Sequence, residues 1–274
     1  MKAIKLILLG VSLFSILPLG AQVFDKPRSL AEADSLDRVQ YRVLYQLDFI
    51  SDPTDREYVT QDQVRLDIGT QISKVYSLKH YQADSAATPL IETGRFPRKI
   101  VTDVVPPMIL YRGYPKTQDI TTDYRLPAGA PVMSYVEPKP TLQWQVKPEK
   151  REILGHSCQR AEVSFGGRQW IAWFTSEIPL SEGPYKFGGL PGLILEVADS
   201  EGDYRYTCIG IANLSAGENI VRWKWNQRPT TRKELEKIIV QLYANPEQAI
   251  KALGGRMGFK GDPMLNLPYN PIEK

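Results

Sequence analysis

Cysteine and histidine are scarce in this chain, with two of each among its 274 residues. Long apolar runs are absent after the first 21 residues, which excludes a protein with several membrane-spanning helices. The G-x-S-x-G, H-E-x-x-H and nucleotide-binding fingerprints are absent too, so no common enzyme class is indicated, and neither is a cofactor or a metal site. With 42% apolar and 24% charged residues, the composition is that of a globular protein. The sequence therefore favours a non-enzymatic protein and leaves an enzymatic activity open.

The beginning of the chain has the three-part layout of a cleaved secretory signal peptide, over residues 1–21. Lys2 and Lys5 form its positively charged start, Leu6 to Leu19 is its apolar stretch, and small residues stand at the cleavage site. The residue directly after that site is Gln22 and not a cysteine, so we do not expect a lipoprotein. We predict export to the periplasm or the extracellular space, with no membrane span in the mature protein.

Net charge is also small. The 34 basic and 31 acidic residues give +3, and removal of Lys2 and Lys5 with the signal peptide lowers this to +1. The charges are interspersed, whereas a nucleic-acid-binding protein normally carries a basic stripe or patch. Nucleic acid is therefore not an expected partner.

The mature chain is expected to contain a polar, mobile leader at residues 22–38 and a single β-rich domain at residues 39–274. From Val39 to Phe49 apolar and polar residues alternate, which is typical of a strand with one buried face. Residues 84–140 hold nine prolines. Because proline cannot donate to a β-ladder, we expect an irregular insert with short strands at 109–114 and 132–136.

Beyond this insert the strands are easier to recognise. Residues 157–165 and 168–175 flank Gly166-Gly167, which predicts a hairpin with a two-residue turn. Thr231 and Glu234 fit a capping box at the start of a helix. The predicted fold is a single antiparallel, strongly curved sheet, either a half-barrel or an open barrel, with one or two C-terminal helices packed on it.

The most distinctive stretch spans residues 183–194. Its glycines suggest a phosphate-binding loop, but such loops precede a helix, and this one precedes a predicted strand. Leu190 to Leu193 suit a type II turn in which Gly192 adopts a positive φ. The motif residues are Gly183, Pro184, Gly189, Leu190, Pro191, Gly192, Leu193 and Ile194.

Residues 189–194 spell G-L-P-G-L-I, and on this motif the chain resembles the GLPGLI family of exported bacterial envelope proteins. The resemblance is strong over about residues 141–211 and weak over 84–140. The resemblance implies a role in the cell envelope, and an accessory role beside an outer-membrane transporter is one possibility. It implies no biochemical activity. The order of the strands is also similar to that of LolA-type lipoprotein carriers.

Cys158 and Cys208 are the only cysteines, and export would allow them to form a disulfide. In a simple meander they lie three strand spacings apart, roughly 14 Å, so only a curled or reordered sheet would join them. His156 and Cys158 share one face of a strand and could bind a metal or form a nucleophile pair, although an ordinary half-buried pair is favoured. Glu177, Glu182 and Glu196 surround the motif and could supply an acid–base pair, or they could simply cap backbone amides or face water.

Six aromatic residues form the tentative binding surface, with burial in the core as the favoured alternative: Trp170, Trp173, Tyr185, Phe187, Trp223 and Trp225. The leading hypothesis is a non-enzymatic envelope protein of unknown specific function that binds a protein partner or a ligand. The alternative is a carrier that holds an apolar ligand, a lipid or a peptide, against a LolA-like concave sheet.

Overall fold

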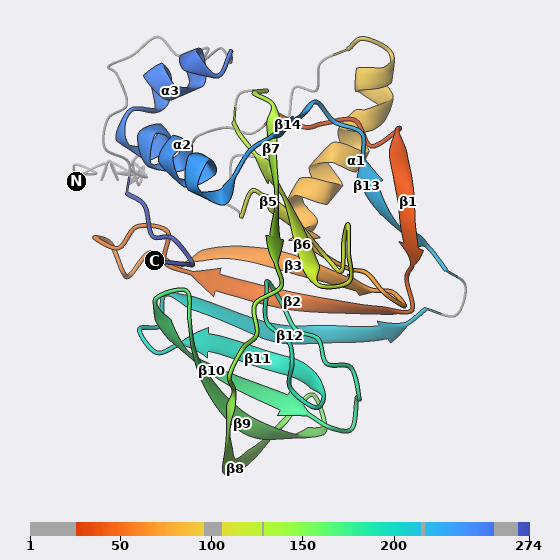
Figure 1. The fold of residues 1–274 in the computed structure, drawn as a ribbon, viewed down its shortest axis with the longest axis vertical. Coiled ribbons are helices and arrows are strands. Elements are labelled where there is room, and N and C mark those ends of the chain that lie inside the picture. Colours follow the sequence, from red (N-terminus) through yellow and green to blue (C-terminus); the bar gives the residue numbers. More distant parts are fainter. Residues whose placement is uncertain (1–25, 96–105, 128, 215–216, 255–267) are drawn as a thin grey trace, which may run out of the picture.

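The computed structural model describes residues 26–95, 106–127, 129–214, 217–254 and 268–274 (Figure 1). The predicted signal peptide, residues 1–21, lies outside the described residues. Within them, a large sheet holds 12 strands. Their spatial order is β14 (Gln227–Pro229), β7 (Val132–Pro138), β6 (Asp119–Arg125), β5 (Met108–Arg112), β4 (Ser73–Ser77), β3 (Thr60–Ile68), β2 (Tyr41–Phe49), β12 (Tyr204–Asn213), β11 (Leu193–Asp199), β10 (Arg168–Thr175), β9 (His156–Phe165) and β8 (Gln145–Ile153).

This sheet is built from two meanders. Strands β2 to β7 follow one another in space as in sequence, and so do β8 to β12. The two meanders meet where β2 pairs antiparallel with β12 along its whole length, from Tyr41 opposite Asn213 to Phe49 opposite Tyr204. Strand β2 therefore lies at the centre of the sheet.

The prediction of a single antiparallel, strongly curved sheet is wrong. The described residues form two sheets, and the larger one is mixed because β14 runs parallel to β7. It is open, with β14 and β8 at its two edges, and it is not strongly curled. The physical reason is the pairing of β2 with β12, which joins the meanders edge to edge and so extends the sheet instead of closing it.

The second sheet has two strands, β1 (Ala33–Arg38) and β13 (Asn219–Trp223). Residues 33–38, which the sequence assigned to a leader, thus form an ordered strand. The irregular segment expected at 84–140 contains the second half of helix α1 (Leu78–Glu92) and the three strands β5, β6 and β7. Two of these overlap the expected short strands, and β6 was not anticipated.

Helices α2 (Arg232–Ala244) and α3 (Pro246–Ala252) follow the last strand. The predicted capping box is present, because the Thr231 hydroxyl accepts from the backbone of Glu234 and the Glu234 carboxylate accepts from the backbone of Thr231. Leu235, Ile239 and Leu242 bury one side of α2 in a cluster that includes side chains of β6 and β7.

The result is a layered arrangement (Figure 1). Helix α2 and the 183–194 segment cover one face of the large sheet. The β1–β13 ribbon covers the other face over β4 and β5, through a cluster that joins Trp223 to Tyr76, Ile109 and Tyr111. Alternation along the strands thus buries both faces in this part of the sheet.

Candidate functional site

The signature segment, residues 183–194, completes the core on one face of the large sheet. Phe187 is fully buried, and the centroid of its ring lies 4.6 Å from that of Trp170. Trp144, Phe165 and Tyr185 surround it, with ring centroids 6.4, 6.0 and 6.1 Å away. Two of the tentative binding residues, Trp170 and Phe187, are therefore core residues.

A buried arginine ties this segment to the first meander. Arg112 on β5 donates a 2.7 Å hydrogen bond from Nη1 to the carbonyl oxygen of Phe187, and its Nη2 pairs with the Glu182 carboxylate. Ser73 on β4 donates to the same carboxylate at 2.8 Å. Glu182, considered above as an acid–base residue, is thus engaged in a structural ion pair.

The glycines of the signature are explained by close contacts. A Cβ on Gly192, whose φ is +154°, would lie 2.0 Å from the carbonyl oxygen of Thr175. The predicted type II turn is not the one formed, because the Gly192 amide donates to the Leu190 carbonyl two residues back. Gly183 leaves room for Ile194, whose Cδ1 would be 2.9 Å from an added Cβ.

Cys158 and Cys208 are free and buried. They lie on β9 and β12, with β10 and β11 between them, so the ordered meander keeps their strands apart. Burial raises the pKa of each thiol to about 11. A nucleophilic cysteine has a lowered pKa and an electropositive environment, and neither thiol meets that description.

His156 pairs with a carboxylate and not with Cys158. Its Nδ1 lies 2.7 Å from Oε2 of Glu177, whose other oxygen accepts from the Ser157 amide at 3.0 Å. The hydrogen bond from His156 and then that from the amide lower the pKa of Glu177. Glu177 therefore acts as a backbone cap on the surface, which was one of the two alternatives.

The other tryptophans lie in two separate places. Trp173 is half-buried, with the Arg151 guanidinium 4.2 Å from its ring centroid. Trp223 and Trp225 stack on each other at 5.1 Å beneath the β1–β13 ribbon. The six tentative binding residues are thus not brought together in one surface.

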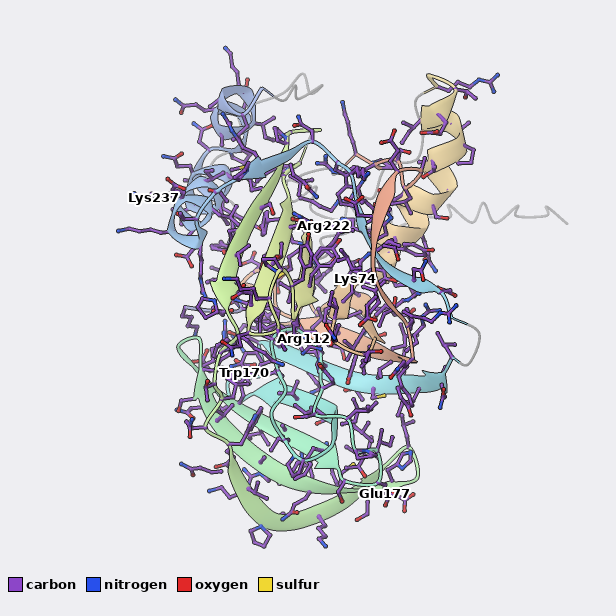
Figure 2. The ribbon with its side chains drawn as sticks, turned by 45° about the vertical axis from the view of Figure 1, so that its right-hand side comes forward. Lys74, Arg112, Trp170, Glu177, Arg222 and Lys237 are labelled. Carbon is purple, nitrogen blue, oxygen red and sulfur yellow. The ribbon has the colours of Figure 1, made fainter. Side chains whose placement is uncertain are left out.

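Trp223 belongs to a cage around a buried amine. Lys74 Nζ lies 3.3 Å from the centroid of the Trp223 ring and donates to the carbonyl oxygen of Val221 at 2.8 Å. Burial lowers the pKa of Lys74 to about 7, against the opposing effects of Asp67 and Asp123. Lys74 and Arg222 lie close together on this side of the sheet (Figure 2), both near the Tyr111 ring.

A cavity of about 380 Å³ lies on the opposite face, between the large sheet and α2. Its walls are largely aromatic and aliphatic, and they include eight of the chain's 14 tyrosines. These are Tyr76, whose ring packs in the cluster beneath the β1–β13 ribbon on the other face, and Tyr124, Tyr135, Tyr185, Tyr204, Tyr206, Tyr243 and Tyr269. Of the tentative binding residues, Tyr185 alone lines this cavity.

Several of these phenols offer free hydrogen-bonding groups. Among the described residues, the hydroxyls of Tyr124 and Tyr243 have no hydrogen-bond partner. Burial raises the pKa of both groups, so they remain protonated at neutral pH. The cavity therefore presents flat apolar surfaces together with a few hydroxyls.

Charged groups meet in one part of the cavity wall. Lys186 Nζ lies 2.6 Å from Oε1 of Glu273, and Arg232 Nη2 lies 2.6 Å from its Oε2. Tyr185 donates to the same carboxylate. Burial alone would raise the pKa of Glu273, but Lys186, Tyr185 and Arg232 lower it below its ordinary value.

Glu273 belongs to an extended segment, residues 268–274, that forms part of the cavity wall. Asn270 anchors this segment, because its Oδ1 accepts from Arg168 at 2.7 Å and its Nδ2 donates to the carbonyl of Ile50 at 2.8 Å. Lys274 donates from its backbone to the carbonyl of Gly166 at 2.7 Å.

Three carboxylates near this segment lie close enough to one another to bind a metal ion. They belong to Asp199, Glu201 and Asp203. Arg168 Nη1 lies within 2.8 Å of Asp199 and Asp203 and 3.5 Å from Glu201. Since the guanidinium occupies the place that a cation would take, these carboxylates are not an open metal site.

One local feature of the sequence does point to the cavity. Tyr204 and Tyr206 share one parity of a predicted strand and point to the same side. The remaining lining residues come mainly from six other strands, from α2, from the signature segment and from residues 269–274, so only the tertiary fold assembles them.

One family model, described as "Protein of unknown function (Porph_ging)", matches residues 167–196, which cover β10 and the signature segment. No curated protein matches the chain. No helix of the described residues has the length and apolar character needed to cross a membrane.

Two solved structures of PNGF-II, in different crystal forms, are similar to this chain. The first has a TM-score of 0.50 and 12% identity, and covers 75% of this chain and 34% of the other. The second has a TM-score of 0.49 and 13% identity, with coverage of 75% and 33%. The chain thus spans about a third of the length of the PNGF-II chains, and the likeness concerns the fold alone.

Proposed function

We propose that this is an exported envelope protein that binds an apolar ligand in the tyrosine-lined cavity under α2. The cavity carries the proposal, because its volume of about 380 Å³ lies in the range of roughly 300–1,000 Å³ found for small-molecule sites. Its aromatic walls and its few free hydroxyls suit a ligand with an apolar body and one or two polar groups.

The states of the candidate catalytic groups support a binding role over an enzymatic one. The Cys158 thiol has a raised pKa, Glu177 caps the Ser157 amide, and Glu182 is paired with Arg112. None of these groups lines the cavity. A binding protein needs only a shaped cavity, and this chain has one.

Membership of the GLPGLI family and export are parts of the same proposal. The hexapeptide at residues 189–194 falls within the stretch that the family model matches. Together with the signal-peptide pattern of residues 1–21, this supports a location in the periplasm or outside the cell. Accessory work beside an outer-membrane transporter is compatible with such a location.

A protein partner bound along the sheet edge is less well supported. Strand β8 is an edge strand, but it carries Pro148 and several exposed charged residues. Proline and charge on an edge are features that prevent pairing with another chain. The carrier form of the hypothesis therefore rests on the cavity under α2 and not on a LolA-like concave sheet.

Native mass spectrometry of the protein purified from the periplasm of its own host would test the proposal. We expect an apolar molecule to copurify with the wild type. Leu235→Trp on α2 should fill the cavity and abolish copurification. Val240 also lies on α2 at the border of the cavity, and it is 58% exposed. Val240→Trp should therefore weaken binding without disturbing the core.

Leu154→Trp, at an exposed position outside the cavity, serves as the matched control and should retain the ligand. Thermal unfolding should show that all three variants remain folded. A wild type that neither carries nor takes up any apolar molecule would refute the proposal, as would binding by Leu235→Trp equal to that of the wild type.

A further inference from the structure

The charged part of the cavity wall is a complete binding site for a carboxylate. Three donors from two parts of the chain converge on Glu273: the ammonium of Lys186, the guanidinium of Arg232 and the hydroxyl of Tyr185. Charge-assisted hydrogen bonds of this kind are the strongest that a protein provides for an anion.

The site is desolvated, which distinguishes it from a surface ion pair. Lys186 is 3% exposed, and the Glu273 side chain is 7% exposed. Lys186, Arg232, Tyr185 and Glu273 all line the apolar cavity. A carboxylate bound here therefore has tyrosines and aliphatic side chains next to it, where an attached apolar chain would be shielded from water.

Glu273 occupies this site from a segment without helix or strand. The segment has anchors on both sides of Glu273, namely Asn270 on Arg168 and the Lys274 amide on Gly166. The Glu273 carboxylate can thus leave the site while the segment stays attached to the domain.

The charges around the site also allow the Glu273 carboxylate to be exchanged for the carboxylate of a ligand. Lys186 has a second partner in Glu137, at 2.5 Å, and Arg232 has one in Glu236, at 2.7 Å. Neither cation is left unpaired when Glu273 leaves, so the exchange does not create an isolated buried charge. A carboxylate that replaces Glu273 restores the arrangement seen in this structure.

We propose that the cavity takes a single-chain amphiphile with a carboxylate head, which replaces Glu273 at Lys186, Arg232 and Tyr185 while its apolar chain lies against the tyrosines. Glu273 then acts as an internal competitor that holds the site closed until such a ligand arrives. This inference rests on the proposed function, and it adds the chemical class of the ligand and the residue that regulates entry.

Isothermal titration calorimetry with dodecanoate and with dodecan-1-ol separates the head group from the chain. The wild type should bind dodecanoate at least tenfold more tightly than the alcohol. Glu273→Gln keeps the shape of the side chain but removes the competing charge, so it should tighten dodecanoate binding by at least a further tenfold. Its affinity for the alcohol should change less than threefold.

Glu152→Gln is the matched control, because it makes the same substitution at an exposed position on β8 that does not line the cavity. It should alter dodecanoate binding less than threefold. Since both variants are conservative and Glu152 is exposed, thermal unfolding should confirm that each remains folded.

Equal affinities for dodecanoate and the alcohol, or an unchanged dodecanoate affinity in Glu273→Gln, would overturn the inference and leave the cavity proposal intact. Binding of neither compound to the wild type or to Glu273→Gln would count against both proposals.

Discussion

Arg112 and Phe187 stand 75 residues apart in the sequence and are joined by a 2.7 Å hydrogen bond from the guanidinium to the carbonyl oxygen. Arg112 belongs to the first meander, and Phe187 lies between two strands of the second. Figure 2 places Arg112 near the middle of the molecule, above Trp170. The signature segment therefore fastens the two halves of the sheet together across their buried face.

Removal of this connection should destabilise the protein strongly. Arg112→Met leaves the Phe187 carbonyl and the Glu182 carboxylate without their buried partner, which should lower the free energy of unfolding by about 2–4 kcal/mol. Arg205→Met removes an arginine with a 55% exposed side chain from a 3.4 Å pair with Glu196, and should cost less than about 1 kcal/mol. Urea unfolding measures both, and equal effects would mean that the Arg112 connection is not structural.

Gly192→Ala should be similarly damaging because of a steric clash. The new Cβ would lie 2.0 Å from the Thr175 carbonyl oxygen, so β10 and the start of β11 would have to separate. We expect a loss of at least about 3 kcal/mol in urea unfolding. Gly210→Ala, where an added Cβ meets no atom within 4 Å, is the control and should change stability by less than about 1 kcal/mol. Wild-type stability in Gly192→Ala would show that the glycine has another role.

Lys74 should make stability depend on pH above neutrality. Its pKa is about 7 in the folded protein against 10.5 for an ordinary lysine, so between these values the unfolded chain binds more protons. The free energy of unfolding contributed by Lys74 therefore rises with pH across this window and is lowest below pH 7.

The wild type should gain about 2 kcal/mol relative to Lys74→Met between pH 7 and pH 9. Urea unfolding at the two pH values measures this difference. Lys237→Met, at an exposed position on α2, should show no such change relative to the wild type (Figure 2). A stability difference between wild type and Lys74→Met that is constant with pH would mean that the buried amine keeps an ordinary pKa.

Cys158 and Cys208 should behave as two unreactive thiols. In the folded protein at pH 7.5 their burial and their raised pKa values should make alkylation by iodoacetamide far slower than for a free cysteine. In urea without a reductant both should be alkylated, which mass spectrometry counts directly. A chain that takes up no label in urea would contain the disulfide that the sequence left open.

Local features of the fold could be predicted from the sequence. The predicted β9–β10 hairpin is confirmed, because Gly166-Gly167 forms the turn. A two-residue turn and alternation along the strands then place Val163 opposite Trp170 and Ala161 opposite Ala172. The capping box at Thr231 is confirmed for the same reason, since cap residues interact within one helical turn.

Long-range features could not be predicted in this way. Helix α1 is not evident from the sequence, because residues 74–81 fit a strand pattern that runs past the end of β4, whereas Ser77 caps a helix that Pro89 does not interrupt. The cavity was missed because its walls come from strands and a helix far apart in the sequence. Tyr185 was identified as a candidate, but Lys186 and Glu273 were not, since nothing local marks two charges that meet across the fold.

The central position of β2 has a consequence for how the chain folds. Phe49 pairs with Tyr204, and all of β3 to β11 lies between them in the sequence. Contacts of such long sequence separation make folding slow, because the entropy of closing the loop is lost before the pairing is gained. Until β12 arrives, one edge of β2 is an unpaired template for other chains, and we expect aggregation through this edge to compete with folding.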